Sequence, residues 1–344
     1  MRVLVTGGCG FIGSHFIRLL MAEHSDVQVV NLDKMTYAAS FDNVAEVADD
    51  ARYSFVQGDI GDYATARAAL TDCTHVVNFA AESHVDRSIH GATDFIQTDV
   101  MGTYVLMEAA RDAGVERFLQ VSTDEVYGSI ASGSFTEEHP LQPSSPYSAS
   151  KAGGDLQAFA YMHTHGLPVV ITRGSNTYGE NQYPEKLIPL FITNALDGLP
   201  LPVYGDGMQV RDWIHARDHA SGILTALLKG ADGEVYNVGG GNERENMWIT
   251  RTILELTGAS ESLITYVEDR PGHDLRYSLD TTKLRGLGWS PTVDFAAGLR
   301  DTAAWYTDRR AWWEPIKSGE FREFYEKQYK DRLVGQAAGS AVEG

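Results

Sequence analysis

Two short segments carry side chains that could together move protons. Tyr147 and Lys151 stand four positions apart, so on a helix they lie on one face and can contact one ligand. The Lys151 ammonium would stabilise a tyrosinate at Tyr147 and lower its pKa towards a range useful for a general base. Asp124 and Glu125 are adjacent carboxylates, which can serve as acid and base if their environments separate their pKa values. This combination indicates more than simple hydride transfer.

The N-terminus supplies the context for these residues. Arg2–Thr6 reads as a short buried strand, Gly7–Gly13 as a glycine-rich turn, and the residues after it as a helix. This order is typical of a dinucleotide site, where glycines let the backbone approach a pyrophosphate at the helix N-terminus. Asp33 ends the next strand about 20 residues beyond the turn, where an acid binds the ribose. An acid there disfavours a 2′-phosphate, so the sequence favours NAD over NADP.

Composition excludes several classes of function. The chain has 344 residues and a formal net charge of −19, which argues against binding to nucleic acid or to an anionic membrane surface. No apolar run approaches the roughly 20 residues needed to cross a membrane, and the N-terminus predicts no signal peptide. The two cysteines, Cys9 and Cys73, are predicted to be reduced, which favours a cytoplasmic location. No histidine or cysteine spacing predicts a metal site.

Residues 1–175 alternate apolar strands with helices, which predicts an α/β fold with a doubly wound parallel sheet, a Rossmann-type NAD-binding domain that also carries the catalytic residues. The predicted strands are Arg2–Thr6, Val27–Asn31, Tyr53–Gln57, His75–Phe79, Arg117–Ser122 and Leu167–Arg173, and the predicted helices include Tyr63–Leu70, Thr93–Arg111 and Tyr147–His163. Ligands bind at the carboxyl ends of such strands. The glycine turn, Asp33, Asp59 and Thr123–Glu125 should therefore share one rim of the sheet.

Residues 176–333 are less regular and predict a smaller C-terminal α/β lobe that mainly binds the substrate. Its predicted elements are helices near Lys186–Leu196, Ala216–Lys229, Trp248–Thr257 and Phe295–Tyr306, with short strands at Leu201–Tyr204 and Val235–Val238. Residues 334–344 are small and polar, and we expect them to be a disordered tail.

These motifs resemble the extended short-chain dehydrogenase/reductase superfamily, which acts on nucleotide sugars. Within it, the stretches that resemble the 4,6-dehydratases of nucleotide sugars are Leu32–Tyr37, Ala80–Ser88, Ser122–Gly128, Pro184–Pro189, Arg211–Trp213 and Asp269–His273. The resemblance extends from Met1 to about Tyr329. Its most discriminating part is the acidic pair after Thr123, because related epimerases and decarboxylases usually lack that pair.

The resemblance implies a lyase that dehydrates dTDP-glucose to dTDP-4-keto-6-deoxyglucose with tightly bound NAD, regenerated in each turnover. Tyr147, assisted by Lys151, would remove the 4-hydroxyl proton as hydride leaves carbon-4. Glu125 would remove the carbon-5 proton, and Asp124 would protonate the departing 6-hydroxyl. Hydride would then return to carbon-6 as carbon-5 is reprotonated. Thr123 would hydrogen-bond the 4-hydroxyl. Such a step begins deoxysugar biosynthesis, of which rhamnose biosynthesis is one branch.

Binding residues are also implied by the resemblance. The cofactor contacts would be Gly7, Gly10, Phe11, Ile12, Gly13, Asp33, Lys34, Met35, Thr36, Asp59, Ile60, Phe79, Ala80, Ala81, Ser83, Thr98, Tyr147, Lys151 and Thr177. The substrate contacts would be Ser83, Thr123, Asn176, Glu185, Lys186, Leu187, Pro202, Val203, Tyr204, Arg211, Asn246, Asp269, Arg270 and His273. Arg211 is the best candidate for the diphosphate, since a guanidinium can bind it bidentately; the alternative for Arg211 is a surface ion pair with Asp212.

The chain departs from the expected pattern in two places. Gly174 to Thr177 replaces an expected Cys-Ser-Asn-Asn, which keeps Asn176 but changes the contact on the nicotinamide side. Gly179, Glu180 and Asn181 replace an expected Gly-Pro-aromatic, and we expect them near the sugar or nucleotide.

Three other functions remain open from the sequence. A dehydratase of a UDP- or CDP-linked sugar would use the same residues, because nothing in the sequence reads a thymine methyl group. An NAD-dependent nucleotide-sugar 4-epimerase would need Tyr147 and Lys151 but no Asp124–Glu125 pair. A non-catalytic NAD-binding scaffold would be expected to lose one of these side chains. The resemblance also predicts a homodimer that pairs helices Thr93–Arg111 and Tyr147–His163 into a four-helix bundle.

Overall fold

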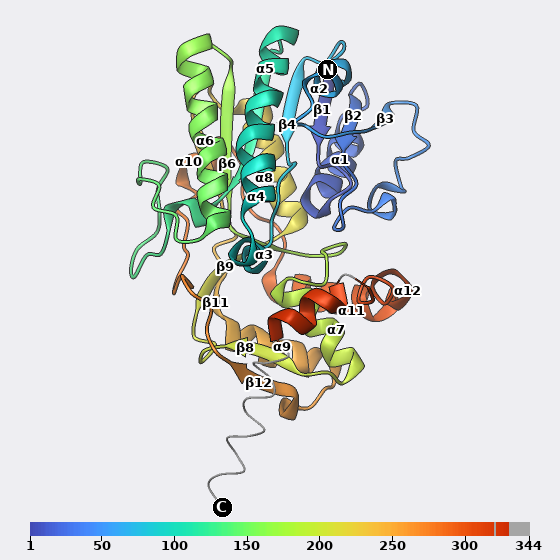
Figure 1. Cartoon of the computed structure of the whole chain (residues 1–344), viewed down its shortest axis with the longest axis vertical. Helices are drawn as coiled ribbons and strands as arrows, with labels where there is room; N and C mark the ends of the chain where they lie inside the picture. Colours follow the sequence, from blue (N-terminus) through green and yellow to red (C-terminus); the bar gives the residue numbers. More distant parts are fainter. Residues whose placement is uncertain (320, 330–344) are drawn as a thin grey trace, which may run out of the picture.

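The structure, a computed structural model, describes residues 1–319 and 321–329. A large sheet with helices on both faces forms one part of the molecule, and a smaller group of helices and short strands lies at the carboxyl edge of that sheet (Figure 1). The predicted tail, residues 334–344, lies outside the described residues.

Seven parallel strands form the large sheet in the order β10-β6-β5-β4-β1-β2-β3. Their bounds are β1 Arg2–Thr6, β2 Gln28–Asp33, β3 Tyr53–Gln57, β4 His75–Asn78, β5 Arg117–Thr123, β6 Val169–Gly174 and β10 Val235–Val238. In β1, Val3, Leu4 and Val5 are all fully buried because helices cover both faces of the sheet. The predicted doubly wound parallel sheet is confirmed.

Helices cover the two faces as separate layers. Helices α1 (Phe11–Glu23) and α8 (Ala216–Lys229) pack together on one face, with the short α10 (Thr282–Arg285) against α8 and β10. Helices α2 (Tyr63–Ala69), α5 (Thr103–Ala113) and α6 (Pro146–His165) pack on the other. Each layer buries its own apolar cluster against the sheet.

The predicted helix Thr93–Arg111 is interrupted. It consists of α4 (Thr93–Phe95), a π-helical segment η2 (Ile96–Gly102) and α5. The short helix α3 (Val85–His90) precedes it. A π-helical segment is a frequent mark of a functional site, and Thr98 of η2 belongs to the predicted cofactor contacts.

The smaller group of elements has its own core. It contains β7 (Asn176–Tyr178), β8 (Leu201–Tyr204), β9 (Val210–His215), β11 (Glu243–Glu245) and β12 (Ile264–Val267), with α7 (Leu187–Asp197), α9 (Asn246–Thr257), α11 (Phe295–Asp308) and α12 (Arg310–Trp313). The remaining short turns are η1 (Phe41–Val44), η3 (Asp124–Tyr127) and η4 (Glu261–Leu263). Strands β11, β9 and β7 form one small sheet, β12 pairs with β8, and buried side chains of α7, α9 and α11 pack around them.

The chain returns to the large sheet after the smaller lobe has begun. Strand β10 pairs with β6, and α8 packs against α1, although both follow residue 175 in the sequence. Residues on both sides of that position therefore share the large sheet, and the two-part division at residue 175 stays a prediction.

Within the described ranges, no helix is both long enough and apolar enough to cross a membrane. Cys9 and Cys73 are buried and unpaired, as predicted for reduced cysteines.

Candidate active site

The glycine turn between β1 and α1 packs too closely for side chains. Gly7 has φ 65°, and a Cβ on Gly13 would lie 2.4 Å from the Gly7 carbonyl oxygen. Gly10 caps α1 without any side-chain hydrogen bond, so no side chain covers the first N–H groups of that helix. The turn thus presents bare backbone at a helix N-terminus, which is the arrangement that binds a pyrophosphate.

Asp33, at the end of β2, holds the turn as well as lining the cavity. Its carboxylate accepts hydrogen bonds from the backbone N–H groups of Cys9, at 2.9 Å, and Met35, at 2.8 Å. The Met35 side chain packs against the apolar core and is absent from the cavity lining, and its predicted contact with a cofactor stays a prediction. Lys34 and Asp59, both predicted cofactor contacts, pair at 2.8 Å.

One continuous cavity brings together most of the predicted residues, from the turn to the catalytic groups. Its lining includes Gly7, Gly10, Phe11, Ile12, Gly13, Asp33, Lys34, Thr36, Asp59, Ile60, Phe79, Ala80, Ala81, Ser83, Thr98, Thr123, Asp124, Glu125, Tyr147, Lys151, Asn176, Thr177, Glu185, Lys186 and Leu187. These residues follow the carboxyl ends of several parallel strands, as ligand sites in such sheets do. The predicted common rim is confirmed.

Tyr147 and Lys151 lie in the first turns of α6. The helix begins at Pro146, and Ser145 and Ser148 form a capping box that fixes its start. Lys151 Nζ donates a hydrogen bond to the Val121 carbonyl oxygen at 2.8 Å, which ties the helix to β5. The two side chains face one cavity, as their spacing predicts.

The pKa of Tyr147 differs from the prediction. Burial raises it well above its ordinary value, and the negative charges of Glu125 and Asp99 raise it further. The predicted lowering of this pKa by Lys151 is wrong for the protein alone. The reason is that the cavity removes the phenol from water and places carboxylates around it.

Thr123, Asp124 and Glu125 leave β5 in a short 3-10 turn. The Thr123 hydroxyl caps that turn by accepting the Glu125 N–H at 3.3 Å. Asp124 is almost fully buried, and burial together with the adjacent Glu125 raises its pKa well above the ordinary value. This environment favours the protonated form of Asp124, which suits a general acid.

Glu125 has a different environment. Burial raises its pKa too, but three cations, Arg270, Lys186 and Arg211, oppose that rise. These cations favour the ionised form that a general base needs. The two adjacent carboxyl groups thus have the separated environments that acid and base roles require.

Glu185 does not present a free carboxylate to a substrate. Its oxygens accept hydrogen bonds from the Tyr37 hydroxyl, at 2.8 Å, and from Arg87 Nε, at 2.9 Å. Burial raises the pKa of Glu185, but the cations around it outweigh burial and hold that pKa below its ordinary value. Lys186, the next residue, donates to the Ser83 carbonyl oxygen and keeps its amine at the cavity wall.

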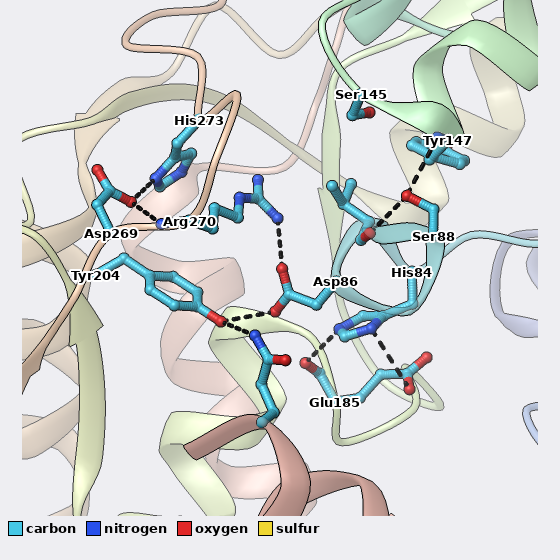
Figure 2. Close-up of polar contacts among 12 residues, drawn as sticks. His84, Asp86, Ser88, Ser145, Tyr147, Glu185, Tyr204, Asp269, Arg270 and His273 are labelled. Carbon is cyan, nitrogen blue, oxygen red and sulfur yellow. Dashed lines mark hydrogen bonds and ion pairs between the residues drawn. The ribbon is translucent and has the colours of Figure 1, made fainter. Parts of the chain in front are cut away.

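The remaining predicted substrate contacts lie outside this cavity. They are Pro202, Val203, Tyr204, Arg211, Asn246, Asp269, Arg270 and His273. The Val203 side chain packs in the apolar core of the smaller lobe, and its predicted substrate contact stays a prediction. Figure 2 shows that Tyr204, Asp269, Arg270 and His273 instead gather opposite α3, with Arg270 directed towards Asp86.

Arg211 does not form the alternative ion pair with Asp212. Its guanidinium stacks on the Tyr277 ring at 4.4 Å and donates to the carbonyl oxygens of Val210 and Asp274. Burial lowers its pKa. A buried guanidinium without a carboxylate partner is suited to an anionic ligand.

Sequence reasoning missed residues that hold the catalytic helix in place. The Ser88 hydroxyl accepts the Tyr147 N–H at 3.2 Å, and the Asp99 carboxylate accepts the Ser150 hydroxyl at 2.6 Å and the Glu82 N–H at 3.0 Å. Ser88 lies in the stretch Ala80–Ser88, which the resemblance had singled out. No local pattern marks Asp99, because its partners are distant in sequence.

The first departure from the expected pattern is compensated locally. A Cβ at Gly174 would lie 2.3 Å from the His219 ring, so glycine there leaves room for that histidine. The Thr177 hydroxyl lies 2.7 Å from His219 Nδ1, and both residues line the cavity.

The second departure lies beside the cavity lining. Glu180 pairs with Arg217 at 3.0 Å and lies 3.5 Å from His215 Nε2, and neither Glu180 nor Asn181 lines the cavity. Their expected place near the sugar or nucleotide stays a prediction. Among the described residues, no cluster of three or more His, Cys, Asp or Glu side chains could hold a metal ion.

Known proteins share both this sequence and this architecture. A sequence profile for the family described as GDP-mannose 4,6 dehydratase matches residues 4–302. The dTDP-glucose 4,6-dehydratase of Streptomyces niveus is 53% identical over 323 residues, covering 92% of this chain and 96% of that protein. DesIV, the dTDP-glucose 4,6-dehydratase of Streptomyces venezuelae solved with NAD bound, is 55% identical with a TM-score of 0.91, covering 92% and 100% of the two chains.

An epimerase of the same architecture is less similar. The UDP-glucose 4-epimerase of Thermus thermophilus, solved with NAD, is 31% identical with a TM-score of 0.83, covering 90% of this chain and 100% of that one. With the fold, the glycine turn and the Thr123–Glu125 turn described above, these similarities decide the family. The chain belongs to the dTDP-glucose 4,6-dehydratases of the extended short-chain dehydrogenase/reductase superfamily.

Proposed function

We propose that the protein converts dTDP-glucose to dTDP-4-keto-6-deoxyglucose and water, as an NAD-dependent lyase. The observation that carries this proposal is the pair of buried carboxyl groups, Asp124 and Glu125, in the same cavity as Tyr147 and Lys151. A 4-epimerase needs no acid and base beside carbons 5 and 6. The pair therefore supports elimination of water over epimerisation.

The residues that line the cavity are suited to binding NAD. The bare glycine turn at the start of α1 suits a pyrophosphate, and Asp33 lines the cavity where a ribose hydroxyl would bind. NAD supplies a hydride acceptor for carbon-4 and returns the hydride at carbon-6. Tyr147 takes the 4-hydroxyl proton, Glu125 takes the carbon-5 proton, and Asp124 gives a proton to the departing 6-hydroxyl. Carbon-5 is protonated again as hydride returns to carbon-6, so in heavy water it gains deuterium.

The glycine turn yields a prediction for cofactor binding. Gly13→Ala should weaken NAD binding more than about tenfold, since the added Cβ would meet the Gly7 carbonyl oxygen at 2.4 Å and force the turn open. Titration calorimetry with NAD-stripped protein measures this. Gly91→Ala is the control, because a Cβ there would have no neighbour within 4 Å. Equal affinities for both variants would contradict the assignment of the turn.

The smaller lobe is proposed to bind mainly the nucleotide sugar. Arg211, Arg270 and Lys186 supply positive charge on that side of the catalytic carboxyl groups. The preference for dTDP over a UDP- or CDP-linked sugar rests on the relatives. Deoxysugar formation, with rhamnose as one branch, and a cytoplasmic location stay predictions.

The reaction is tested by incubating purified protein with dTDP-glucose in heavy water without added NAD. A product that has lost one water and carries deuterium at carbon-5 would support the proposal and show that NAD is carried and recycled. A galactose epimer alone would contradict it. If nothing changes, the same assay with added NAD and with UDP-, CDP- and GDP-sugars tests the alternative substrates.

A homodimer is also proposed, through the helices on the α5–α6 face. Large apolar side chains are exposed along this face at Ile96, Met101, Tyr104 and Leu156. Helices α5 and α6 pack side by side, so these side chains can form one patch that a second copy would cover (Figure 1).

The dimer makes a specific prediction. Leu156 is 59% exposed, and Leu156→Glu should place a charge in the proposed interface and yield a monomer by light scattering. Leu199→Glu is the matched control, because Leu199 is 43% exposed but follows α7 in the smaller lobe. We expect wild type and the control to be dimers. A monomeric wild-type protein would contradict the proposed homodimer.

A further inference from the structure

Two largely buried guanidinium groups lie near the catalytic carboxyl groups, and among the described residues only one of them forms an ion pair. Arg211 is 5% exposed, and no carboxylate of the described residues forms an ion pair with it. Arg270 has one ion-pair partner within the described chain, Asp86, at 2.9 Å. The charge on Arg270 lowers the pKa of Arg211, so the two cations are close enough to repel one another. Buried like charges in this arrangement call for an anionic ligand.

Asp86 connects α3 to the smaller lobe through both carboxylate oxygens. Oδ1 accepts a hydrogen bond from Arg270 Nη1 at 2.9 Å, and Oδ2 accepts the Tyr204 hydroxyl at 2.8 Å (Figure 2). Asp86 is only 4% exposed. Burial raises its pKa, but His84 and Arg270 outweigh burial and keep the carboxyl group ionised.

The partners of Asp86 are themselves held in place. The Tyr204 hydroxyl accepts Gln328 Nε2 at 2.6 Å, and Gln328 Oε1 lies 2.7 Å from Nε2 of His90, at the other end of α3. The contacts Asp86–Tyr204–Gln328–His90 therefore form a ring that closes on one short helix. Such a ring leaves the Asp86 carboxylate few alternative positions, and so it can orient a guanidinium precisely enough to bind a ligand.

The same helix supports the catalytic tyrosine. Ser88, two residues after Asp86, accepts the Tyr147 N–H, and Figure 2 shows this contact to the upper right of the Asp86–Arg270 pair. Helix α3 thus contacts the catalytic helix with one residue and the charged segment of the smaller lobe with another.

We propose that Asp86 is a positioning residue, which fixes the Arg270 guanidinium so that Arg270 and Arg211 together bind the diphosphate of the nucleotide sugar. Asp86 itself touches neither the sugar nor the phosphates. This inference rests on the proposed function for the identity of the ligand, and it adds a residue to which neither a motif nor the resemblance gave a role.

The test is a double-mutant cycle with Asp86→Asn and Arg270→Gln, read by titration calorimetry with dTDP. Asp86→Asn should weaken dTDP binding by about tenfold, because the guanidinium loses its charged partner and its fixed orientation. The double variant should bind dTDP no more weakly than Arg270→Gln alone, because Asp86 acts only through Arg270. Additive losses would overturn the proposal.

A general loss of structure is distinguished by further measurements. In Asp86→Asn, KM for dTDP-glucose should rise by about the same factor as the Kd for dTDP, while kcat stays within about twofold of wild type. This pattern is expected because the diphosphate contact stabilises the bound substrate and the transition state equally. Tyr204→Phe removes one hydrogen bond but keeps the charge pair, so its loss of affinity should be smaller. Asp197→Asn removes the partner of Arg310 and Lys317 elsewhere in the smaller lobe and should leave dTDP binding unchanged. Normal dTDP binding by Asp86→Asn, or a fall in kcat without a change in KM, would overturn the proposal.

The proposal can fail separately from the proposed reaction. Calorimetry with dTDP needs no turnover, so wild-type protein that binds dTDP but does not dehydrate dTDP-glucose would contradict the reaction alone. Wild-type turnover together with equal dTDP affinity for Asp86→Asn would contradict the positioning role alone.

Discussion

Glu125→Gln should stop the reaction after carbon-4 has been oxidised. Removal of the general base is expected to lower kcat by about 10²–10⁴-fold. Oxidation at carbon-4 depends on Tyr147 and Lys151, whose contacts this variant leaves intact. With enzyme in excess and an acid quench, mass spectrometry should detect a nucleotide sugar that has lost two hydrogens but no water.

Asp124→Asn is the matched comparison for Glu125→Gln, because it changes the adjacent carboxyl group in the same turn. In heavy water, Asp124→Asn should still exchange the carbon-5 hydrogen of the oxidised sugar, since Glu125 remains. Glu125→Gln should show no such exchange. Rapid product formation by Glu125→Gln, or exchange in that variant alone, would reverse the assignment of acid and base.

Burial raises the pKa of both groups, but their charged neighbours differ, and this difference can give adjacent residues separate acid and base roles. Asp124 is buried against Glu125, which raises its pKa, whereas Glu125 is surrounded by Arg270, Lys186 and Arg211. Adjacency in the sequence predicts that two carboxyl groups share a site. It does not predict which of them is neutral, because the cations come from segments far away along the chain.

Local patterns predicted the elements that carry the site well. Strand β1, the glycine turn and α6 are predicted from apolar runs, glycine spacing and helical patterning, all of which neighbouring residues determine. Their convergence on one rim follows from the topology of parallel sheets. These features needed no information about distant contacts.

Long-range pairing was beyond such patterns. The sequence of β10 is a short apolar run that could belong to either lobe. Only its pairing with β6 places it in the large sheet. Glu185 reads as a substrate contact, yet Tyr37 and Arg87 occupy its carboxylate, and both come from segments about 100 or more residues away along the chain. Val203 packs in an apolar core that is built from segments far apart in the sequence, so the residues around Val203 do not predict that core.

Tyr147→Phe is the second variant with a large expected effect. Removing the hydroxyl should prevent oxidation at carbon-4, lowering kcat by about 10²–10⁴-fold with no oxidised sugar in the quenched reaction. The Tyr147 ring packs with Val85 and forms a T-shaped contact with the Phe95 ring. Phenylalanine at position 147 preserves both contacts. The hydrogen bond from the backbone N–H of residue 147 to the Ser88 hydroxyl is also unchanged. Thermal unfolding and NAD affinity should therefore match those of wild type.

The two variants together separate the steps of the proposed reaction. Tyr147→Phe should accumulate neither oxidised sugar nor carbon-5 deuterium, whereas Glu125→Gln should accumulate the first without the second. Burial and the carboxylates raise the pKa of Tyr147, so ionisation of its hydroxyl in the protein alone is unfavourable at neutral pH. A positive charge in the cavity would favour the tyrosinate, and NAD in its oxidised form brings one. Carbon-4 oxidation at the wild-type rate by Tyr147→Phe would show that another group accepts the 4-hydroxyl proton.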